Sequence, residues 1–320
     1  MTIIEVQELH KRYEGIVAVQ DVSFTVRRGE IFGILGPDGA GKTTTVECIE
    51  GLRRRDGGEI LVLGLDPQHD RVRLRERLGA QRQNCPLPDR LRVTESLELF
   101  ASFYPNPADP AELVERLGLT EQRDAAFGTL SGGQRKRLSI AIALVGRPEI
   151  VVFDELTSGL DPQTRRVTWE LIRHVRDSGV TVLMATPLME EAERLCDRVA
   201  LIDAGRVVAV DSPAELVARA HPEQRIRFRP TAPLDMGPFT MLPEVSSVCR
   251  EDGQVVVTGT GEVAHAVTSL LARQGVVAAE LRLEQASLED AFLALTGRRL
   301  RSDDSEFAGI EIADETREVP

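Results

Sequence analysis

Residues 36–43 read Gly-Pro-Asp-Gly-Ala-Gly-Lys-Thr, a spacing of glycines and one lysine that can hold the phosphates of a nucleotide. Glycines allow backbone N–H groups to turn inward around phosphate oxygens, and a following helix adds the positive end of its dipole. Lys42 would reach the terminal phosphates, and the Thr43 hydroxyl would bind Mg²⁺. A plain glycine-rich turn is the alternative. The motif predicts binding of nucleotide phosphate and no particular reaction.

Two adjacent carboxylates, Asp154 and Glu155, follow the apolar run Ile150-Val-Val-Phe. A continuous apolar run of this length predicts a buried strand, which would deliver both side chains at its carboxyl end. One carboxylate can hold the Mg²⁺ shell while its neighbour polarises the attacking water, an arrangement used in phosphoryl transfer. An isolated Asp-Glu pair is usually a solvated turn. Together with a phosphate loop, the pair predicts hydrolysis of a nucleotide.

A third segment, Leu130-Ser-Gly-Gly-Gln134, places a serine and two glycines at the start of an expected helix. This is a second helix N-terminus suited to phosphate. One nucleotide needs only one such phosphate-binding site, so the second site is expected to bind the nucleotide of another subunit. The basic run 135–137 that follows is typical of a solvated helix face and does not indicate nucleic acid.

The elements that must position these residues alternate between strand and helix. Apolar runs predict buried strands at 31–35, 149–154 and 180–185, and helical patterns cover 43–51 and 164–177. Residues 84–147 are expected to be mostly helical. Such alternation predicts a mainly parallel sheet covered by helices.

Composition narrows the class of protein. The chain has 320 residues with 42% hydrophobic and 28% charged residues, which fits about two globular domains. Its 39 basic and 51 acidic residues give a net charge of −12, so overall charge does not favour nucleic acid. The four cysteines lack metal-binding spacing, and reduced thiols are expected. No apolar run is long enough to span a bilayer and the N-terminus lacks the pattern of a secretory signal, so we expect a cytoplasmic protein.

With these motifs in order, residues 3–215 resemble the nucleotide-binding subunit of ATP-binding cassette (ABC) transporters. The resemblance implies a P-loop NTPase of α/β class, whose mixed, mainly parallel sheet is accompanied by antiparallel β and helical subdomains. It implies that Leu130–Gln134 is the family signature and that Glu155 is the catalytic glutamate, assisted by Lys42 and Gln83. The implied ATP-binding residues are Tyr13, Gly36, Pro37, Asp38, Gly39, Ala40, Gly41, Lys42, Thr43 and Thr44.

The resemblance also implies a Mg²⁺ cofactor and a head-to-tail dimer. Thr43, Gln83 and the Walker B residue Asp154 would bind the metal, and Asp161 would belong to the D-loop. The signature residues Ser131, Gly132, Gly133 and Gln134 would face the ATP of the opposite subunit. Two assignments stay open at this point. Tyr13 either stacks on adenine or is a half-buried strand residue, and Gln83 could be out of register by two residues, which would favour Gln81.

Three residues depart from the family pattern. Asp38 replaces Asn or Ser in the phosphate loop and Leu156 replaces a proline, and both changes are expected to be tolerated. Pro187 stands where the family has a histidine that bonds the γ-phosphate and orients the attacking water. Proline has neither a donor side chain nor an N–H. We therefore expect ATP binding and dimer closure with slow hydrolysis that depends on Glu155.

The expected domains are an ABC domain at 1–220 with a helical subdomain at about 84–147, a small α+β domain at 221–300 and an acidic, disordered tail at 301–320. The closing segment 287–297 resembles that of daunorubicin-resistance-type ATP-binding proteins, whose permease is a separate chain. The small domain would support dimerisation or regulation, or simply pack.

The combined prediction is an ATPase subunit of a drug, antibiotic or lipid exporter, peripheral on the cytoplasmic face of the membrane. Its expected partners are an ABC-2-type permease, contacted through the helical segment after Gln83, and a second ATP-binding subunit in a homodimer or heterodimer; no nucleic acid is expected. The alternatives are a catalytically degenerate or regulatory subunit and a soluble ABC ATPase without a transport role.

Overall fold

The computed structural model describes residues 1–81, 87–220, 223–251, 253–284 and 286–297. Its central sheet has six strands in the order β5-β6-β7-β3-β8-β9. The strands are β3 (Ile31–Leu35), β5 (Leu78–Gln81), β6 (Ile150–Asp154), β7 (Thr181–Thr186), β8 (Arg198–Asp203) and β9 (Arg206–Asp211). All neighbours pair in parallel except β8 with β9. The expected α/β class with a mainly parallel sheet is confirmed.

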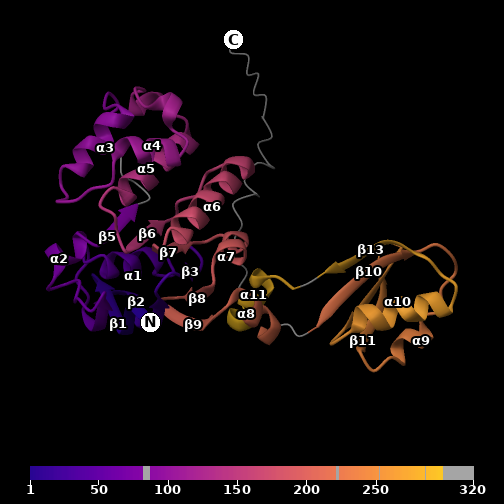
Figure 1. Cartoon of the computed structure of the whole chain (residues 1–320). Coiled ribbons are helices and arrows are strands. Elements are labelled where there is room, and N and C mark those ends of the chain that lie inside the picture. Colours follow the sequence, from indigo (N-terminus) through magenta and orange to yellow (C-terminus); the bar gives the residue numbers. More distant parts are fainter. Residues whose placement is uncertain (82–86, 221–222, 252, 285, 298–320) are drawn as a thin grey trace, which may run out of the picture.

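A second sheet, antiparallel and in the order β2-β1-β4, lies beside the first (Figure 1). It contains β1 (Thr2–Tyr13), β2 (Ile16–Arg27) and β4 (Gly57–Val62). Its apolar side chains share one core with the face of the central sheet that carries Phe32 and Ile34. Phe24 of β2 stacks on Phe32 of β3 with ring centroids 5.2 Å apart, so the two sheets are held together by direct aromatic packing.

Helices between residues 132 and 195 cover the other face of the central sheet, and helices between residues 93 and 144 form a lobe beyond its β5 edge (Figure 1). The helices between residues 42 and 75 instead share the core of the second sheet. The helices of the first 220 residues are α1 (Lys42–Ile49), α2 (Arg71–Arg75), α3 (Val93–Ala101), α4 (Pro110–Arg116), α5 (Gly132–Leu144), α6 (Pro162–Asp177), α7 (Met189–Leu195) and α8 (Pro213–Ala220). Leu97, Leu113 and Leu138, one from each of α3, α4 and α5, are buried in a common core that continues to Phe153 of the sheet.

The chain beyond α8 builds a third, four-stranded antiparallel sheet in the order β11-β12-β10-β13. Its elements are β10 (Gln224–Pro230), α9 (Gly237–Thr240), β11 (Val245–Glu251), β12 (Gln254–Gly259), α10 (Val263–Arg273) and β13 (Ala278–Glu284). This sheet has a core of its own around Phe228 and Phe239. The closing helix α11 (Leu288–Thr296) does not join this core. Leu288 and Phe292 pack with Leu216 of α8 in the core of residues 1–220, here called the first unit; residues 223–284 form the C-terminal sheet unit.

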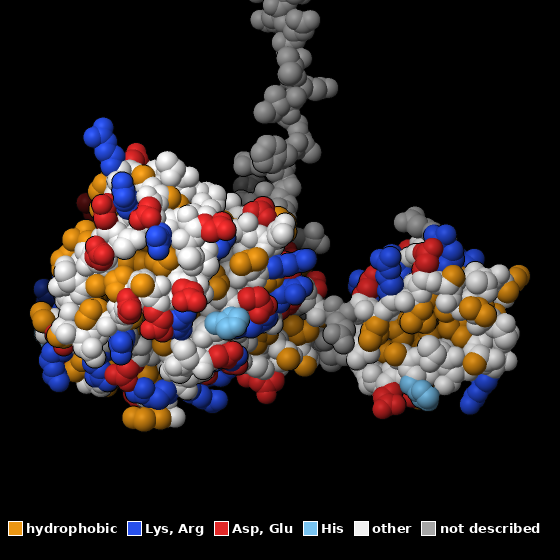
Figure 2. All heavy atoms as spheres, turned by 45° about the horizontal axis from the view of Figure 1, so that its top comes forward, with side chains coloured by type: hydrophobic (Ala, Val, Ile, Leu, Met, Phe, Trp, Pro, Cys, Tyr) orange, Lys and Arg blue, Asp and Glu red, His pale blue; other side chains and the backbone are white. Residues whose placement is uncertain are grey.

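The surface of the first unit carries basic and acidic side chains mixed together, without a field of one sign in the view of Figure 2. In the part of the chain that the structure describes, no helix has the length and apolar character required to cross a membrane.

Candidate active site

Three neighbouring strands bring the predicted site residues to one edge of the central sheet. In the parallel register Leu35 of β3 lies beside Thr186 of β7, and Asp154 of β6 lies beside Ala185. The carboxyl ends of these strands therefore meet (Figure 1). Ligands of open α/β sheets bind outside such ends. The phosphate loop, the carboxylate pair and Pro187 all emerge at this edge.

The phosphate loop is tightly packed between β3 and α1. A Cβ added to Gly36 would lie 2.1 Å from the carbonyl oxygen of Ile202, and Gly41 has a φ of 98° with the Ala18 carbonyl only 2.4 Å from an added Cβ. Side chains at both positions would clash with backbone, so the spacing of these glycines is required by the loop's path.

Lys42 folds back over the loop that precedes it. Its Nζ donates to the carbonyl oxygens of Gly36 at 2.9 Å and Pro37 at 3.0 Å, and only 4% of the side chain is exposed. Burial lowers the pKa of this ammonium, while nearby carboxylates, Glu155 first, oppose the shift. The cation is thus held where phosphate oxygens would replace the two carbonyls.

Thr43 and Asp154 form the pair suited to a divalent metal. The Thr43 hydroxyl donates to Asp154 Oδ1 at 3.4 Å, and Asp154 is 6% exposed. Burial raises the pKa of Asp154, and the adjacent Glu155 adds to this rise. A hydroxyl and a carboxylate fit the hard oxygen ligands of Mg²⁺, which completes its shell with water and substrate phosphate. Elsewhere in the described part of the chain, no group of three or more His, Cys, Asp or Glu side chains is placed to hold a metal ion.

Glu155 has an uncommon backbone conformation. Its φ is 48°, in the left-handed region, and its N–H donates to the Ala185 carbonyl of β7 at 2.9 Å. Such a conformation costs about 1 to 3 kcal/mol in a residue other than glycine, and residues that adopt it cluster at functional sites. Glu155 thus turns the chain out of β6 directly after Asp154.

The expected signature begins α5 through a capping box. Ser131 Oγ accepts from the Gln134 N–H at 3.3 Å, and Gln134 Oε1 accepts from the Ser131 N–H at 2.8 Å. Ser131 and Gly132 are exposed, whereas a Cβ on Gly133 would lie 2.6 Å from Thr164 of α6. Asp161 caps α6 and accepts from the Gln163 and Thr164 N–H groups.

Among the described residues, the signature makes no polar contact with the phosphate loop of the same chain: no hydrogen bond or ion pair joins residues 131–134 to residues 36–44. The roles expected for these segments stay predictions.

The remaining expected residues occupy different settings. Tyr13 ends β1, half-buried, with Lys11 Nζ 5.5 Å and the Arg53 guanidinium 5.4 Å from its ring centroid. Gln83 lies outside the described residues, and the alternative Gln81 is the buried last residue of β5. Pro187 is half-buried, and the preceding Thr186 Oγ1 accepts from the Leu188 N–H at 3.1 Å. These positions leave the roles of Tyr13 and Gln83 untested.

A buried glutamate behind the site was missed from the sequence. Glu191 of α7 is 1% exposed, and its Oε1 accepts from the Thr157 hydroxyl at 2.7 Å and from Trp169 Nε1 at 2.9 Å. This carboxylate ties α7 and α6 to the segment that follows Glu155. The one sequence signal was the single tryptophan, because a buried indole N–H needs an acceptor.

Asp38 is expected to lower nucleotide affinity slightly, because its carboxylate lies near the Lys42 ammonium. Its Oδ1 lies 3.7 Å from Lys42 Nζ, and its side chain is 87% exposed. Replacing Asp38 with asparagine removes a negative charge that competes with phosphate for the ammonium. Because the group is solvated, we expect ATP to bind only about two- to fivefold more tightly, with less difference at high salt. Titration with a fluorescent ATP analogue measures this, with Asp235→Asn as the distant control; unchanged or weaker binding would contradict it.

Comparison with known proteins agrees with this geometry. Residues 19–158 match the family model described as ABC transporter. The chain is 36% identical to the Nod factor export ATP-binding protein I of Ralstonia nicotianae, covering 93% of this chain and 95% of the relative. It is 34% identical to the daunorubicin resistance ATP-binding protein DrrA3 of Streptomyces coeruleorubidus, covering 92% and 96%.

Solved structures give the same fold. A dimeric ATP-binding cassette in a post-hydrolysis state, with ADP and phosphate bound, superimposes with a TM-score of 0.60 at 24% identity. It covers 65% of this chain and 98% of its own length.

Proposed function

Because this chain belongs to the ABC transporter family, we propose that it is the ATP-hydrolysing subunit of an exporter whose membrane permease is a separate chain. The observation that carries the proposal is the meeting of Lys42, Thr43, Asp154 and Glu155 at one edge of the sheet. The relatives named for Nod factor export and daunorubicin resistance, which match along nearly their whole lengths, support an export role.

In the proposed reaction the phosphate loop and Lys42 bind the β- and γ-phosphates of ATP. Thr43 and Asp154 would hold Mg²⁺, which neutralises developing charge on the phosphates. Glu155 would accept a hydrogen bond from the attacking water and polarise it. Asp154 is buried and accepts a hydrogen bond from Thr43, whereas Glu155 lies just beyond the end of β6, so the two adjacent carboxylates can hold a metal and a water separately.

The exposed signature supports a head-to-tail dimer. Ser131 and Gly132 are on the surface and are not joined to the chain's own phosphate loop by any hydrogen bond among the described residues. A second copy could present its signature to the ATP held here, so that each nucleotide lies between two subunits. The partner would be an identical chain or a related ATP-binding subunit.

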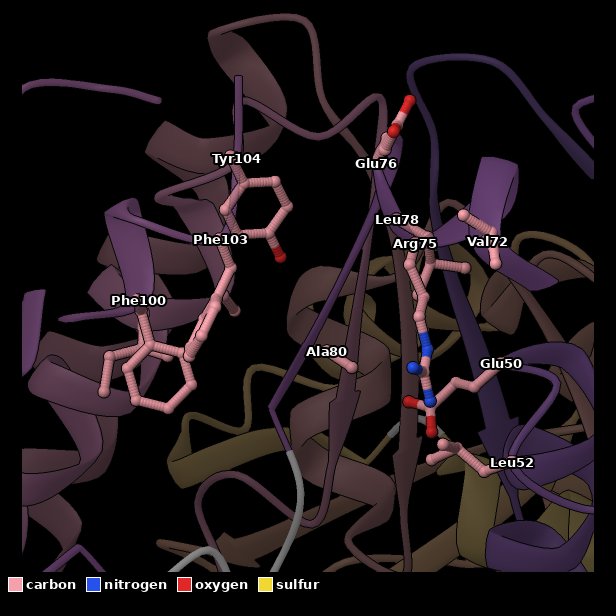
Figure 3. A pocket seen from close by; sticks show the side chains of 12 residues that line it. Glu50, Leu52, Val72, Arg75, Glu76, Leu78, Ala80, Phe100, Phe103 and Tyr104 are labelled. Atoms are coloured by element: carbon pink, nitrogen blue, oxygen red, sulfur yellow. The ribbon is translucent and has the colours of Figure 1, made fainter. Parts of the chain in front are cut away.

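A groove between the helical lobe and the sheet is a suitable permease contact. Phe100, Phe103 and Tyr104 line one wall, and Val72 and Arg75 line the other (Figure 3). Phe103 is 68% exposed and Val72 is 77% exposed. Apolar side chains this open, rimmed by charge, favour the apolar face of a short partner helix. We propose that an ABC-2-type permease inserts such a helix here and holds the chain at the cytoplasmic face of the membrane.

Replacing Phe103 with aspartate should therefore weaken attachment to the permease at least about tenfold, because a charge would be buried in the contact. The tagged chain is purified from membranes of the cells in which it naturally occurs. Any permease that co-purifies is identified and measured by mass spectrometry. Val277→Asp is the matched control, since Val277 is 67% exposed on the separate C-terminal sheet unit. If no polytopic membrane protein co-purifies with the wild type, or if Phe103→Asp and the control retain it equally, the permease proposal fails.

Pro187 favours one alternative: a slow or degenerate subunit that pairs with a competent relative. The loop after β7 lacks the side-chain donor that the family pattern places there. In that case this chain would bind ATP and close the dimer while its partner supplied most of the turnover.

A further inference from the structure

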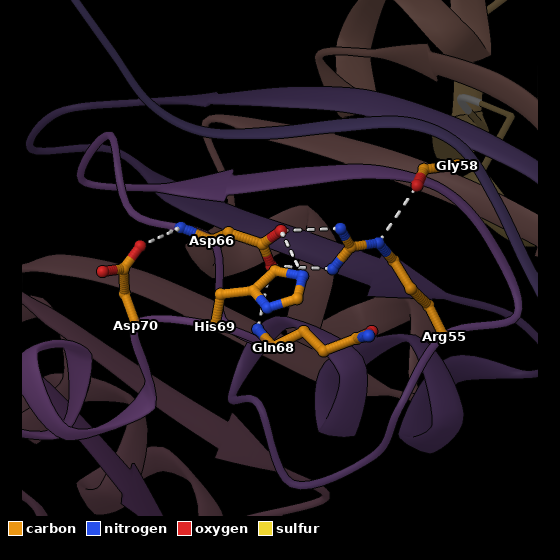
Figure 4. Close-up of polar contacts among 6 residues, drawn as sticks. All are labelled: Arg55, Gly58, Asp66, Gln68, His69 and Asp70. Carbon is orange, nitrogen blue, oxygen red and sulfur yellow. Dashed lines mark hydrogen bonds and ion pairs between the residues drawn. The ribbon is translucent and has the colours of Figure 1, made fainter.

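A basic pocket adjoins the groove described above, and Leu52 lines both. This pocket is lined by residues 51–54, by Gln68 and His69 of a second loop and by Arg71, the first residue of α2, and it measures about 370 Å³. The second loop is held by a two-bond ion pair in which Arg55 Nη1 and Nη2 each donate to a different oxygen of Asp66 at 2.8 Å (Figure 4). This pair lowers the pKa of Asp66 to about 2. Both partners of this ion pair therefore stay charged at all ordinary pH values.

Three arginines, Arg53, Arg54 and Arg71, line this pocket, and no described residue that lines it carries a carboxylate, although Asp66 lies 3.9 Å from the lining His69. The acidic residues nearby are already paired with other cations. Asp66 is bound by Arg55, Asp70 by Arg73 at 3.4 Å and Glu47 by Arg53 at 2.8 Å. Within the described residues, Arg54 and Arg71 have no ion-pair or hydrogen-bond partner. Two guanidinium groups thus share one pocket without a counter-charge.

The side chain of Gln68 provides a second, independent observation. The backbone N–H of Gln68 donates to Asp66 Oδ1 at 2.9 Å. The buried carboxamide oxygen of Gln68, however, has no hydrogen-bond partner. A buried polar atom without a partner is uncommon in a folded protein and costs about 1 to 3 kcal/mol. Because Gln68 lines the pocket, a turn of its side chain would bring the NH₂ donor to an anion bound there. The pocket thus combines two unpaired cations with an amide whose oxygen lacks a partner.

We propose that this pocket, formed by Arg54, Gln68, His69 and Arg71, binds a phosphate group other than those of the ATP at the phosphate loop. Arginine forks and amide donors match the oxygens of a phosphate mono- or diester. Two sources share this chemistry: the headgroup of an anionic phospholipid and a soluble phosphate ester.

The position of the pocket in the fold bears on which of the two sources supplies the phosphate group. Arg71 lines the pocket, the next residue, Val72, lines the permease groove, and Leu52 lines both. If the groove holds a permease, the pocket lies next to the membrane surface; the lipid source therefore rests on the proposed function. Phosphate binding itself does not.

The experiment uses the full chain with saturating ADP and Mg²⁺, so that the phosphate loop is filled. Inorganic phosphate is titrated by NMR, and binding to vesicles with and without phosphatidylglycerol is measured by flotation. Arg54→Gln/Arg71→Gln should weaken phosphate or anionic-vesicle binding about 30-fold, at roughly tenfold per 1.4 kcal/mol and near 1 kcal/mol per arginine. Arg250→Gln/Arg273→Gln, with the same change in net charge on the C-terminal sheet unit, should have no effect.

A third variant separates a built site from simple attraction between charges. Gln68→Met keeps size and net charge, and it should weaken phosphate binding several-fold. Loss in both pocket variants with vesicles identifies a lipid headgroup, and loss with free phosphate alone identifies a soluble ester. Equal behaviour of the pocket and control double variants, or no effect of Gln68→Met, would overturn the proposal. None of these measurements requires a permease or ATP turnover, so they can fail or succeed independently of the transport function.

Discussion

Replacing Glu155 with glutamine is expected to lower the rate of ATP turnover by about 10²- to 10⁴-fold, the usual contribution of a general base. Glutamine keeps the size of the side chain, and nothing in the substitution relieves or adds to the left-handed φ of 48°. The change therefore isolates the charge. ATP affinity should stay close to that of the wild type, because the substitution leaves Lys42 and the loop proposed to bind the phosphates unchanged. Turnover is measured as phosphate release with Mg²⁺, and affinity with a fluorescent ATP analogue.

The same variant should also accumulate as a dimer when ATP is present, since closure would no longer be reversed by hydrolysis. Size-exclusion chromatography with light scattering measures this. Glu59→Gln, an exposed glutamate on β4, provides the control for a change of one charge. Turnover that persists at the wild-type rate in Glu155→Gln would exclude Glu155 as the base and would require another group to polarise the water.

The buried strands of this fold could be predicted because each is fully covered on both faces. Ile31–Leu35 and the first four residues of Ile150–Asp154 are continuous apolar runs, and every residue of both strands is buried. The strand Gly57–Val62 was missed, because it begins with two glycines and only Ile60 and Val62 are buried. The position of the closing helix was also beyond reach. This helix packs against Leu216 of α8, and the whole C-terminal sheet unit separates the two helices in the sequence.

The candidate site divides in the same way between local and distant interactions. The phosphate loop could be predicted because its conformation depends on the spacing of its own glycines. The Glu191 contacts could not, since Thr157, Trp169 and Glu191 come from three separate elements and meet only through folding. The arginines of the basic pocket were equally hidden: Arg54 and Arg71 look like ordinary solvated charges until the loop fixed by Asp66 brings them together.

The second large effect is expected from restoring a donor at position 187. Pro187→His should raise ATP turnover about 10²-fold, the usual value of one contact that stabilises developing charge. The position is suited to this because β7 ends between β3 and β6, beside both the phosphate loop and the carboxylate pair. The turn should tolerate the change, because the bond from the Leu188 N–H to Thr186 Oγ1 does not involve the atoms of residue 187.

Pro187→Ala provides the matched control, since it removes the ring and supplies an N–H but no side-chain donor. If alanine raises turnover as much as histidine does, backbone relaxation and not an imidazole donor explains the gain. A gain with histidine alone, lost again in the double variant with Glu155→Gln, would mean that this site is a working ATPase slowed by one missing contact. Tight ATP binding without turnover in every variant would instead favour a subunit that closes on ATP and leaves hydrolysis to a partner. The two outcomes differ in what drives transport: in the first, each site reopens the dimer by its own hydrolysis, whereas in the second only the partner's site does so.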